Sequence, residues 1–89
     1  MDARTVREAM ADGLETGGVS YLTHQGRRHA FVAGERDFTI AELAMDSLAR
    51  MELCIAVELC TGVSMLPEEI ERHASLGAIA DEIGRRLRA

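Results

Sequence analysis

The chain has 89 residues, 47% hydrophobic and 28% charged, which is the composition of one soluble globular domain with no room for a second core. Fifteen acidic and ten basic residues give a net charge of −5, which argues against a nucleic-acid binder that depends on a basic field. All ten basic residues are arginine, so a Walker A phosphate loop and Schiff-base catalysis are excluded. Aromatic residues are only 3% of the chain, so the core must consist of Leu, Ile, Val, Met and Ala, a set that favours helices.

The sequence predicts neither a membrane span nor a targeting segment. Its longest uninterrupted apolar run is Leu53–Val57, whereas a span requires about 20 residues. The N-terminus lacks the apolar stretch of a secretory signal, so we expect a cytoplasmic protein. Cys54 and Cys60 agree with this location, because a helix would separate them by about 9 Å, too far for a disulfide. Both are expected to be free thiols that act as small core residues.

The first predicted element is an amphipathic helix over residues 2–15. Val6, Met10 and Leu14 recur at the spacing of one helix face, and Gly17-Gly18 ends the segment.

Residues 19–33 follow, and they are predicted to form either a β-hairpin or an irregular surface loop. Two segments enriched in Thr, Tyr, Phe and Val flank Gln25-Gly26, which is a hairpin pattern. A two-residue turn there would place Val19 opposite Val32. It would also present Arg27 and Arg28 at the tip.

Two helix starts are predicted in the middle of the chain. Thr39 and Glu42 fit a capping box, which indicates a short helical turn. Asp46 is a suitable N-cap for a helix from Ser47 to about Cys60 that is apolar almost all round. A helix of that kind is either largely buried or uses its outer face for a partner.

The C-terminal part is predicted to hold a short and a long helix. Pro67 and the acidic residues after it start the short one, which runs to about His73. Ser75 then caps a helix with an apolar face that extends to Leu87. The sum is a mainly α, four-helix bundle, with three main helices, one short helix and the possible hairpin inserted at 19–33.

No arrangement of residues indicates an enzyme. Ser47 lacks a Gly-x-Ser-x-Gly context, and the histidines and cysteines lack metal-ligand spacing. The acidic group after Pro67 is typical of a helix N-terminus, not of a general acid and base. The histidines are His24, His29 and His73, and the acids are Glu68, Glu69 and Glu71.

Ser47 is a stronger candidate for a functional residue than the histidines and acidic residues. It follows an N-cap residue at the start of a strong helix, where unpaired N–H groups and the helix dipole favour an anion. A phosphate ester on this hydroxyl would be stabilised there. The alternative is that Asp46 and Ser47 merely cap the helix.

The triplet Asp46-Ser47-Leu48, followed by Glu52-Leu53, resembles the Asp-Ser-Leu signature of acyl and peptidyl carrier proteins. Further segments resemble that family in register with the triplet. They are the link and short helix at 61–70, the start of the last helix at 75–80 and, more loosely, the first helix at 2–15. Ala44 departs from the pattern, because the family usually has Gly two residues before the Asp. The segment 18–34 is longer than the usual first loop.

The resemblance implies a single carrier domain over residues 1–89 that carries 4′-phosphopantetheine on Ser47, with Asp46 and Leu48 as part of the attachment site. The implied partners are a phosphopantetheinyl transferase, an acyl-loading ligase or acyltransferase, and downstream synthases. Ile55 is expected in the core. The residues implied for docking are Leu48, Arg50, Met51, Glu52 and Glu58.

The cargo stays open between acyl and aminoacyl groups. The low acidity of the Ser47 helix favours polyketide, nonribosomal peptide or related secondary metabolism, with a discrete monomeric carrier as the default. A peptidyl or aryl carrier of a nonribosomal system is one alternative. An unmodified helical interaction domain is another, and regulatory phosphorylation of Ser47 is a third.

Arg27 and Arg28, at the tip of the possible hairpin, would serve one dedicated partner, such as a loading ligase.

Overall fold

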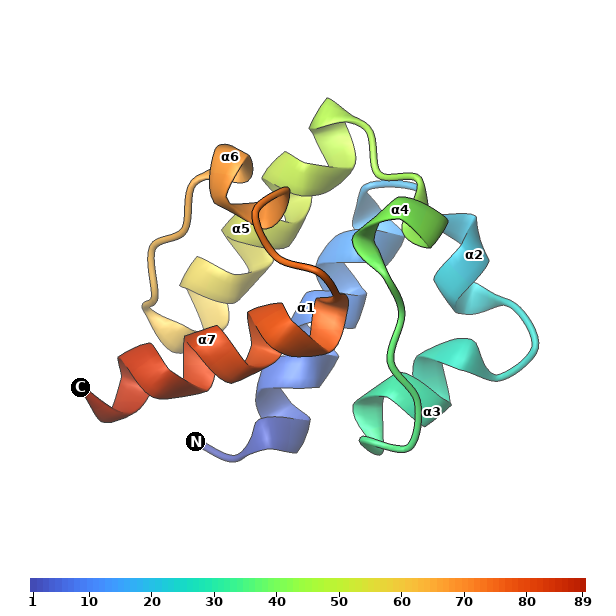
Figure 1. Cartoon of the computed structure of the whole chain (residues 1–89). Coiled ribbons are helices and arrows are strands. Elements are labelled where there is room, and N and C mark those ends of the chain that lie inside the picture. The colour runs from blue at the N-terminus through green and yellow to red at the C-terminus, as the bar shows by residue number, and fades with distance from the viewer.

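Three long helices form the body of the protein, and four short helices connect them (Figure 1). The structure is a computed structural model that describes all 89 residues, and it contains no strands. The elements in chain order are α1 (Ala3–Thr16), α2 (Ser20–Thr23), α3 (Arg27–Val32), α4 (Ile40–Leu43), α5 (Ser47–Thr61), α6 (Pro67–Ile70) and α7 (Leu76–Arg88).

The helix α1 packs antiparallel to α5. Its amphipathic pattern buries Val6, Met10 and Leu14, as the spacing predicted. The two helices approach most closely at Gly13, which lies against Leu53, and at Gly17, which lies against Ala49. Glycine is needed at this contact because each position lacks room for a side chain. Ser47, at the start of α5, therefore lies near the C-terminal end of α1.

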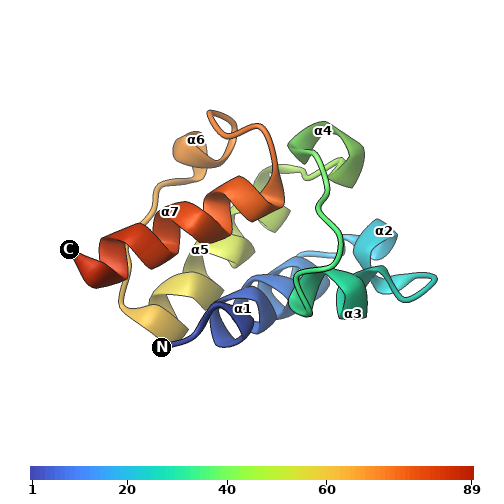
Figure 2. The same cartoon turned by 60° about the horizontal axis from the view of Figure 1, so that its bottom comes forward.

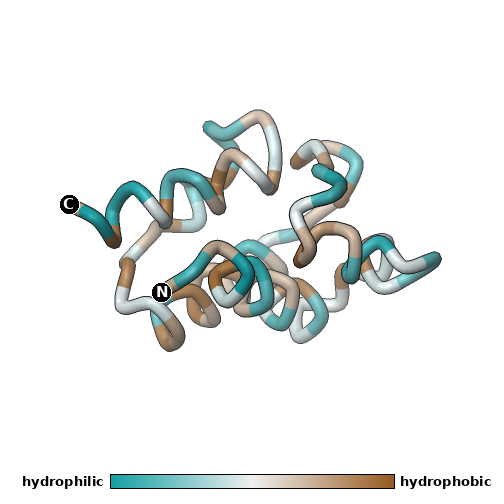
Figure 3. The backbone as a smooth tube through the Cα atoms, turned by 90° about the horizontal axis from the view of Figure 1, so that it is seen from below, coloured by the Kyte–Doolittle hydropathy of each residue, from teal (hydrophilic) through white to brown (hydrophobic).

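The last helix, α7, lies over the α1–α5 pair, and its end returns to the neighbourhood of the N-terminus (Figures 1 and 2). Ser75 caps it by accepting a hydrogen bond from the N–H of Ala78 at 3.1 Å, as predicted. The core is one cluster of 21 buried residues, and no charged or polar side chain is buried. Hydrophobic positions recur between hydrophilic ones along the helices, in keeping with one buried face for each (Figure 3).

The β-hairpin considered for residues 19–33 is wrong, because this segment forms α2 and α3. Gln25 and Gly26 do turn the chain, with φ of 54° and 71°. The flanking segments are nevertheless helical, and they bury Leu22 and Phe31 completely against the body. A lone pair of strands would find no third strand to pair with. Burial of these side chains outweighs the strand propensity of the local sequence.

Arg27 and Arg28 are not presented at a tip, which corrects the second part of that prediction. The guanidinium of Arg27 stacks 4.0 Å from the ring centre of Tyr21 and donates to its carbonyl oxygen. Arg28 pairs with Asp12 at 2.7 Å and with Glu15 at 3.0 Å. Arg28 therefore attaches the 19–33 segment to α1, whereas Arg27 makes its contacts within the segment.

The segment before α5 is held to the start of α7. The carboxylate of Asp37 accepts a hydrogen bond from the Gly77 N–H at 2.7 Å, and the Leu76 N–H donates to the Phe38 carbonyl at 2.8 Å. The capping box of α4 forms as predicted, with Thr39 accepting from the Glu42 N–H. These contacts fix the chain that leads into α5.

Ala44 adopts a left-handed conformation at the end of α4, with φ 50° and ψ 46°. This is the position where the carrier-protein pattern has glycine. The backbone here turns sharply towards Asp46, and an alanine pays a steric cost of about 1 kcal/mol in that region.

No helix in the structure combines the length and the hydropathy that a membrane crossing requires.

Candidate functional site

Ser47 is the first residue of α5, and its side chain is exposed. Asp46 caps the helix as predicted, because its Oδ1 accepts a hydrogen bond from the Ala49 N–H at 2.8 Å. The hydroxyl of Ser47 takes no part in this cap and makes no hydrogen bond. The capping role thus belongs to Asp46 alone, and the Ser47 hydroxyl is accessible for covalent modification.

The first turn of α5 also leaves backbone donors unpaired. The N–H of Ala49 is bound by Asp46, and that of Arg50 donates to the Asp46 carbonyl at 3.1 Å. The N–H groups of Ser47 and Leu48 precede them and have no carbonyl within the helix to bind. Together with the helix dipole, they favour a negative charge beside the Ser47 oxygen.

A shallow depression of about 290 Å³ lies beside Ser47, between the start of α5 and α6. Its charged groups are one cation, from Arg50, and two carboxylates, from Glu68 and Glu71. Met51 and Pro67 complete the lining with Ser47. A group attached to Ser47 would therefore lie next to a mixed polar and apolar surface.

Arg50 bridges the two sides of this depression. One guanidinium nitrogen donates to the Met45 carbonyl at 3.0 Å and lies 3.2 Å from a carboxylate oxygen of Glu71. The arginine side chain is 23% exposed and that of Glu71 62% exposed. The sequence indicated Arg50 as a docking residue. Its contact with Glu71 was not part of that prediction, because the contact depends on how α6 packs against α5.

An apolar stripe runs along the outer face of α5 from the Ser47 end, formed by Leu48, Met51, Ile55 and Leu59. Leu48 and Met51 are 53% and 47% exposed, so both docking candidates are accessible. Leu59 is the most exposed of the four, and its spacing of four residues from Ile55 could have identified it.

Two core predictions on α5 are wrong. Ile55 is 43% exposed, and Cys60 is exposed as well. The packed neighbours cover only one side of the helix, where Leu53 and Val57 are buried. Periodicity could not distinguish the sides, because both carry apolar residues.

The other sites considered on α5 have different environments. Glu52 is half-buried beside α1, whereas Glu58 is exposed. Cys54 is buried and free, and burial, followed by the charges of nearby carboxylates, raises the pKa of its thiol. A thiol with a raised pKa is a poor nucleophile at neutral pH.

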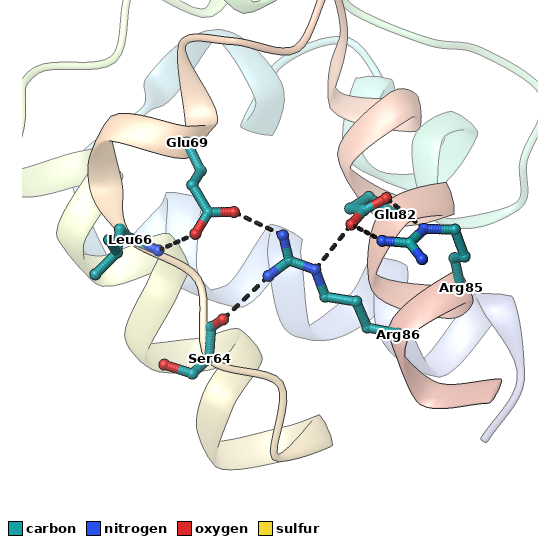
Figure 4. A network of polar contacts seen from close by, with 6 residues as sticks. All are labelled: Ser64, Leu66, Glu69, Glu82, Arg85 and Arg86. Atoms are coloured by element: carbon teal, nitrogen blue, oxygen red, sulfur yellow. Dashed lines mark hydrogen bonds and ion pairs between the residues drawn. The ribbon is translucent and has the colours of Figure 1, made fainter. Parts of the chain in front are cut away.

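Arg86, on α7, holds α6 in place through the network in Figure 4. It donates to Glu69 at 2.7 Å, to Glu82 at 2.8 Å and to the Ser64 carbonyl at 3.1 Å. Glu69 also accepts from the Leu66 N–H at 3.3 Å, which caps α6. Because α6 forms one wall of the depression beside Ser47, Arg86 helps to set the shape of that site.

The histidines do not form a common site. His24 and His29 are exposed in the segment of α2 and α3, and His73 is half-buried between α6 and α7. No group of three or more His, Cys, Asp or Glu residues is placed to hold a metal ion. The acidic residues after Pro67 do not form one cluster, since Glu69 forms an ion pair with Arg86 and Glu71 forms one with Arg50.

No protein-family model, curated protein or solved structure matches this chain.

Proposed function

We propose that the protein is an acyl or aminoacyl carrier that is modified with 4′-phosphopantetheine on Ser47. One observation carries the proposal: the exposed Ser47 hydroxyl has no hydrogen-bond partner, although it lies in the first turn of α5 within Asp46-Ser47-Leu48. Further support comes from the resemblance of the downstream segments to carrier proteins.

The residues around Ser47 fit such a group. No side chain hydrogen-bonds to the hydroxyl, and the N–H groups of Ser47 and Leu48 favour the charge of a phosphodiester. Glu68 and Glu71 oppose that charge, and Arg50 compensates for them. Met51 offers apolar contact to an attached chain.

In the modification, the Ser47 oxygen forms a bond to the phosphorus that carries the pantetheine part of coenzyme A. The pyrophosphate bond of coenzyme A breaks, adenosine 3′,5′-bisphosphate leaves, and a base of the transferase takes the hydroxyl proton. Asp46 contributes by capping α5, which holds the Ser47 backbone in place. The attached group supplies a terminal thiol that carries its cargo as a thioester.

The apolar stripe and the acidic residues near it would receive the partner enzymes in turn. Leu48 and Met51 offer apolar contact beside the attachment point, and Glu52 and Glu58 attract cationic groups and accelerate encounter. Contacts of this limited size suit a carrier that must leave each partner.

The proposal is tested by the intact mass after incubation with coenzyme A and a broad-specificity phosphopantetheinyl transferase. We expect a gain of one phosphopantetheine, which Ser47→Ala abolishes. Ser20→Ala is the matched control, because Ser20 is also the exposed first residue of a helix. Its mass gain should equal that of the unaltered protein. No gain in a protein that circular dichroism shows to be folded would refute the proposal.

The apolar stripe favours a second candidate, an unmodified helical interaction domain. Four exposed apolar side chains along one helix are typical of a surface that binds another protein. Such a domain does not require the Ser47 hydroxyl. It predicts no mass gain, and partner binding that Ser47→Ala leaves unchanged and Leu59→Ser weakens.

A further inference from the structure

The guanidinium of Arg50 lies beside the start of α5, although Arg50 is the fourth residue of that helix. Helical side chains lean towards the N-terminus of their helix. Arg50 follows this rule, because it donates to the carbonyl of Met45, which precedes the helix. Ser47 is three residues before Arg50, and both line the same depression. Arg50 can therefore reach an oxygen attached to the Ser47 hydroxyl.

Arg50 is the only cation in residues 46–71, where six carboxylates accompany it. Within the depression it faces Glu68 and Glu71. A phosphodiester on Ser47 adds another negative charge to this place. Arg50 is the one side chain of the depression that can offset that charge, beside the backbone N–H groups of Ser47 and Leu48.

The contact between Arg50 and Glu71 is suited to exchange. It is a single ion pair at 3.2 Å, and the glutamate is largely exposed. Exposed pairs of this kind contribute little to stability. The non-bridging oxygens of a phosphate, by contrast, match the planar fork of an arginine and accept two hydrogen bonds from it.

We propose that Arg50 is a positioning residue that exchanges Glu71 for the phosphate when Ser47 is modified. This inference rests on the proposed function, since it takes Ser47 as the point of attachment. The exchange orients the phosphate against α5. It also releases the side chain of Glu71, the residue that follows α6, while Glu69 stays bound to Arg86. Modified and unmodified forms then differ at residues 70–73, next to the attachment point.

The test uses the full chain with phosphoserine incorporated at position 47 during synthesis, so it needs no transferase. The ³¹P NMR titration reports the proton affinity of the phosphate. We expect Arg50 to lower this affinity about threefold relative to Arg50→Gln, the size of an exposed ion pair. Arg72→Gln is the matched control, because it removes the same charge from an exposed arginine outside the depression. It should leave the titration of the unaltered protein nearly unchanged.

Two further readouts separate positioning from a purely structural role. Phosphoserine should shift the NMR resonance of the Arg50 Nε–H group and accelerate amide hydrogen exchange at residues 70–73. Arg50→Lys, which keeps the charge but not the fork, should give an intermediate phosphate titration. Glu71→Gln should enlarge the effect of Arg50 on the phosphate titration, because it removes the carboxylate that competes for the guanidinium.

Identical phosphate titrations with Arg50 and with Arg50→Gln would overturn the inference. Equal effects of Arg50→Gln and Arg72→Gln would also overturn it, since they would show a general charge effect. The outcome is independent of the coenzyme A experiment, so the two proposals can fail separately.

Discussion

Gly13 and Gly84 lie within long helices, and we predict that alanine has opposite effects at the two positions. At Gly13 a Cβ atom would lie 2.8 Å from the Glu52 carbonyl oxygen and 2.9 Å from the Cα of Leu53. These are backbone atoms of α5, which cannot move individually. At Gly84 the nearest atom is a terminal nitrogen of Arg88 at 3.3 Å, at the end of a flexible side chain.

The magnitude follows from two opposing terms. Alanine within a helix gains about 1 kcal/mol over glycine. Overpacking of a tight contact costs about 1–3 kcal/mol, and Gly13→Ala lies at the upper end because α1 and α5 must separate. The expected net result is a loss of about 1–2 kcal/mol for Gly13→Ala and a gain of about 0.5–1 kcal/mol for Gly84→Ala.

Thermal and urea unfolding, followed by circular dichroism, measure both changes. In a domain of this size, 1 kcal/mol shifts Tm by about 4–8 °C. Gly13→Ala should therefore lower Tm by about 5–15 °C, and Gly84→Ala should raise it by a few degrees. A stabilised Gly13→Ala protein would refute the close packing of α1 on α5.

Two more predictions concern the left-handed backbone before α5 and the ion pairs of Glu82 on α7. Ala44→Gly should raise the free energy of unfolding by about 1 kcal/mol in urea titrations, because φ is 50° there; a lower value would contradict the left-handed turn. Hydrogen bonds from Arg85, and then Arg86, lower the pKa of Glu82 from its ordinary 4.5 to about 2. Its ionised form therefore stabilises the fold above about pH 5, and this contribution disappears as the pH falls towards 2. Glu82→Gln should reduce the stability difference between pH 7 and pH 3, and an unchanged difference would count against these ion pairs.

The sequence by itself determined the three long helices and most of their ends. Asp46, Ser75 and the Thr39–Glu42 box act on backbone groups within three residues, so their roles can be predicted from local spacing. For the same reason the position of Ser47 at a helix start was predictable. The Ser47 hydroxyl is left without a hydrogen bond because Asp46, and not Ser47, caps the helix.

Tertiary structure alone decided which elements residues 19–33 form, which side of α5 is buried and which distant charges meet. Residues 19–33 became helices because Leu22 and Phe31 are buried against α1, which no local pattern expresses. Ile55 is exposed because no neighbouring helix covers its side of α5.

The contacts that shape the candidate site also join residues far apart in the chain, as in the pairs Arg50–Glu71 and Arg86–Glu69. A capping signal depends on atoms within one turn of a helix, whereas these pairs depend on how α5, α6 and α7 pack. The physical range of each interaction therefore decides whether the sequence can reveal it.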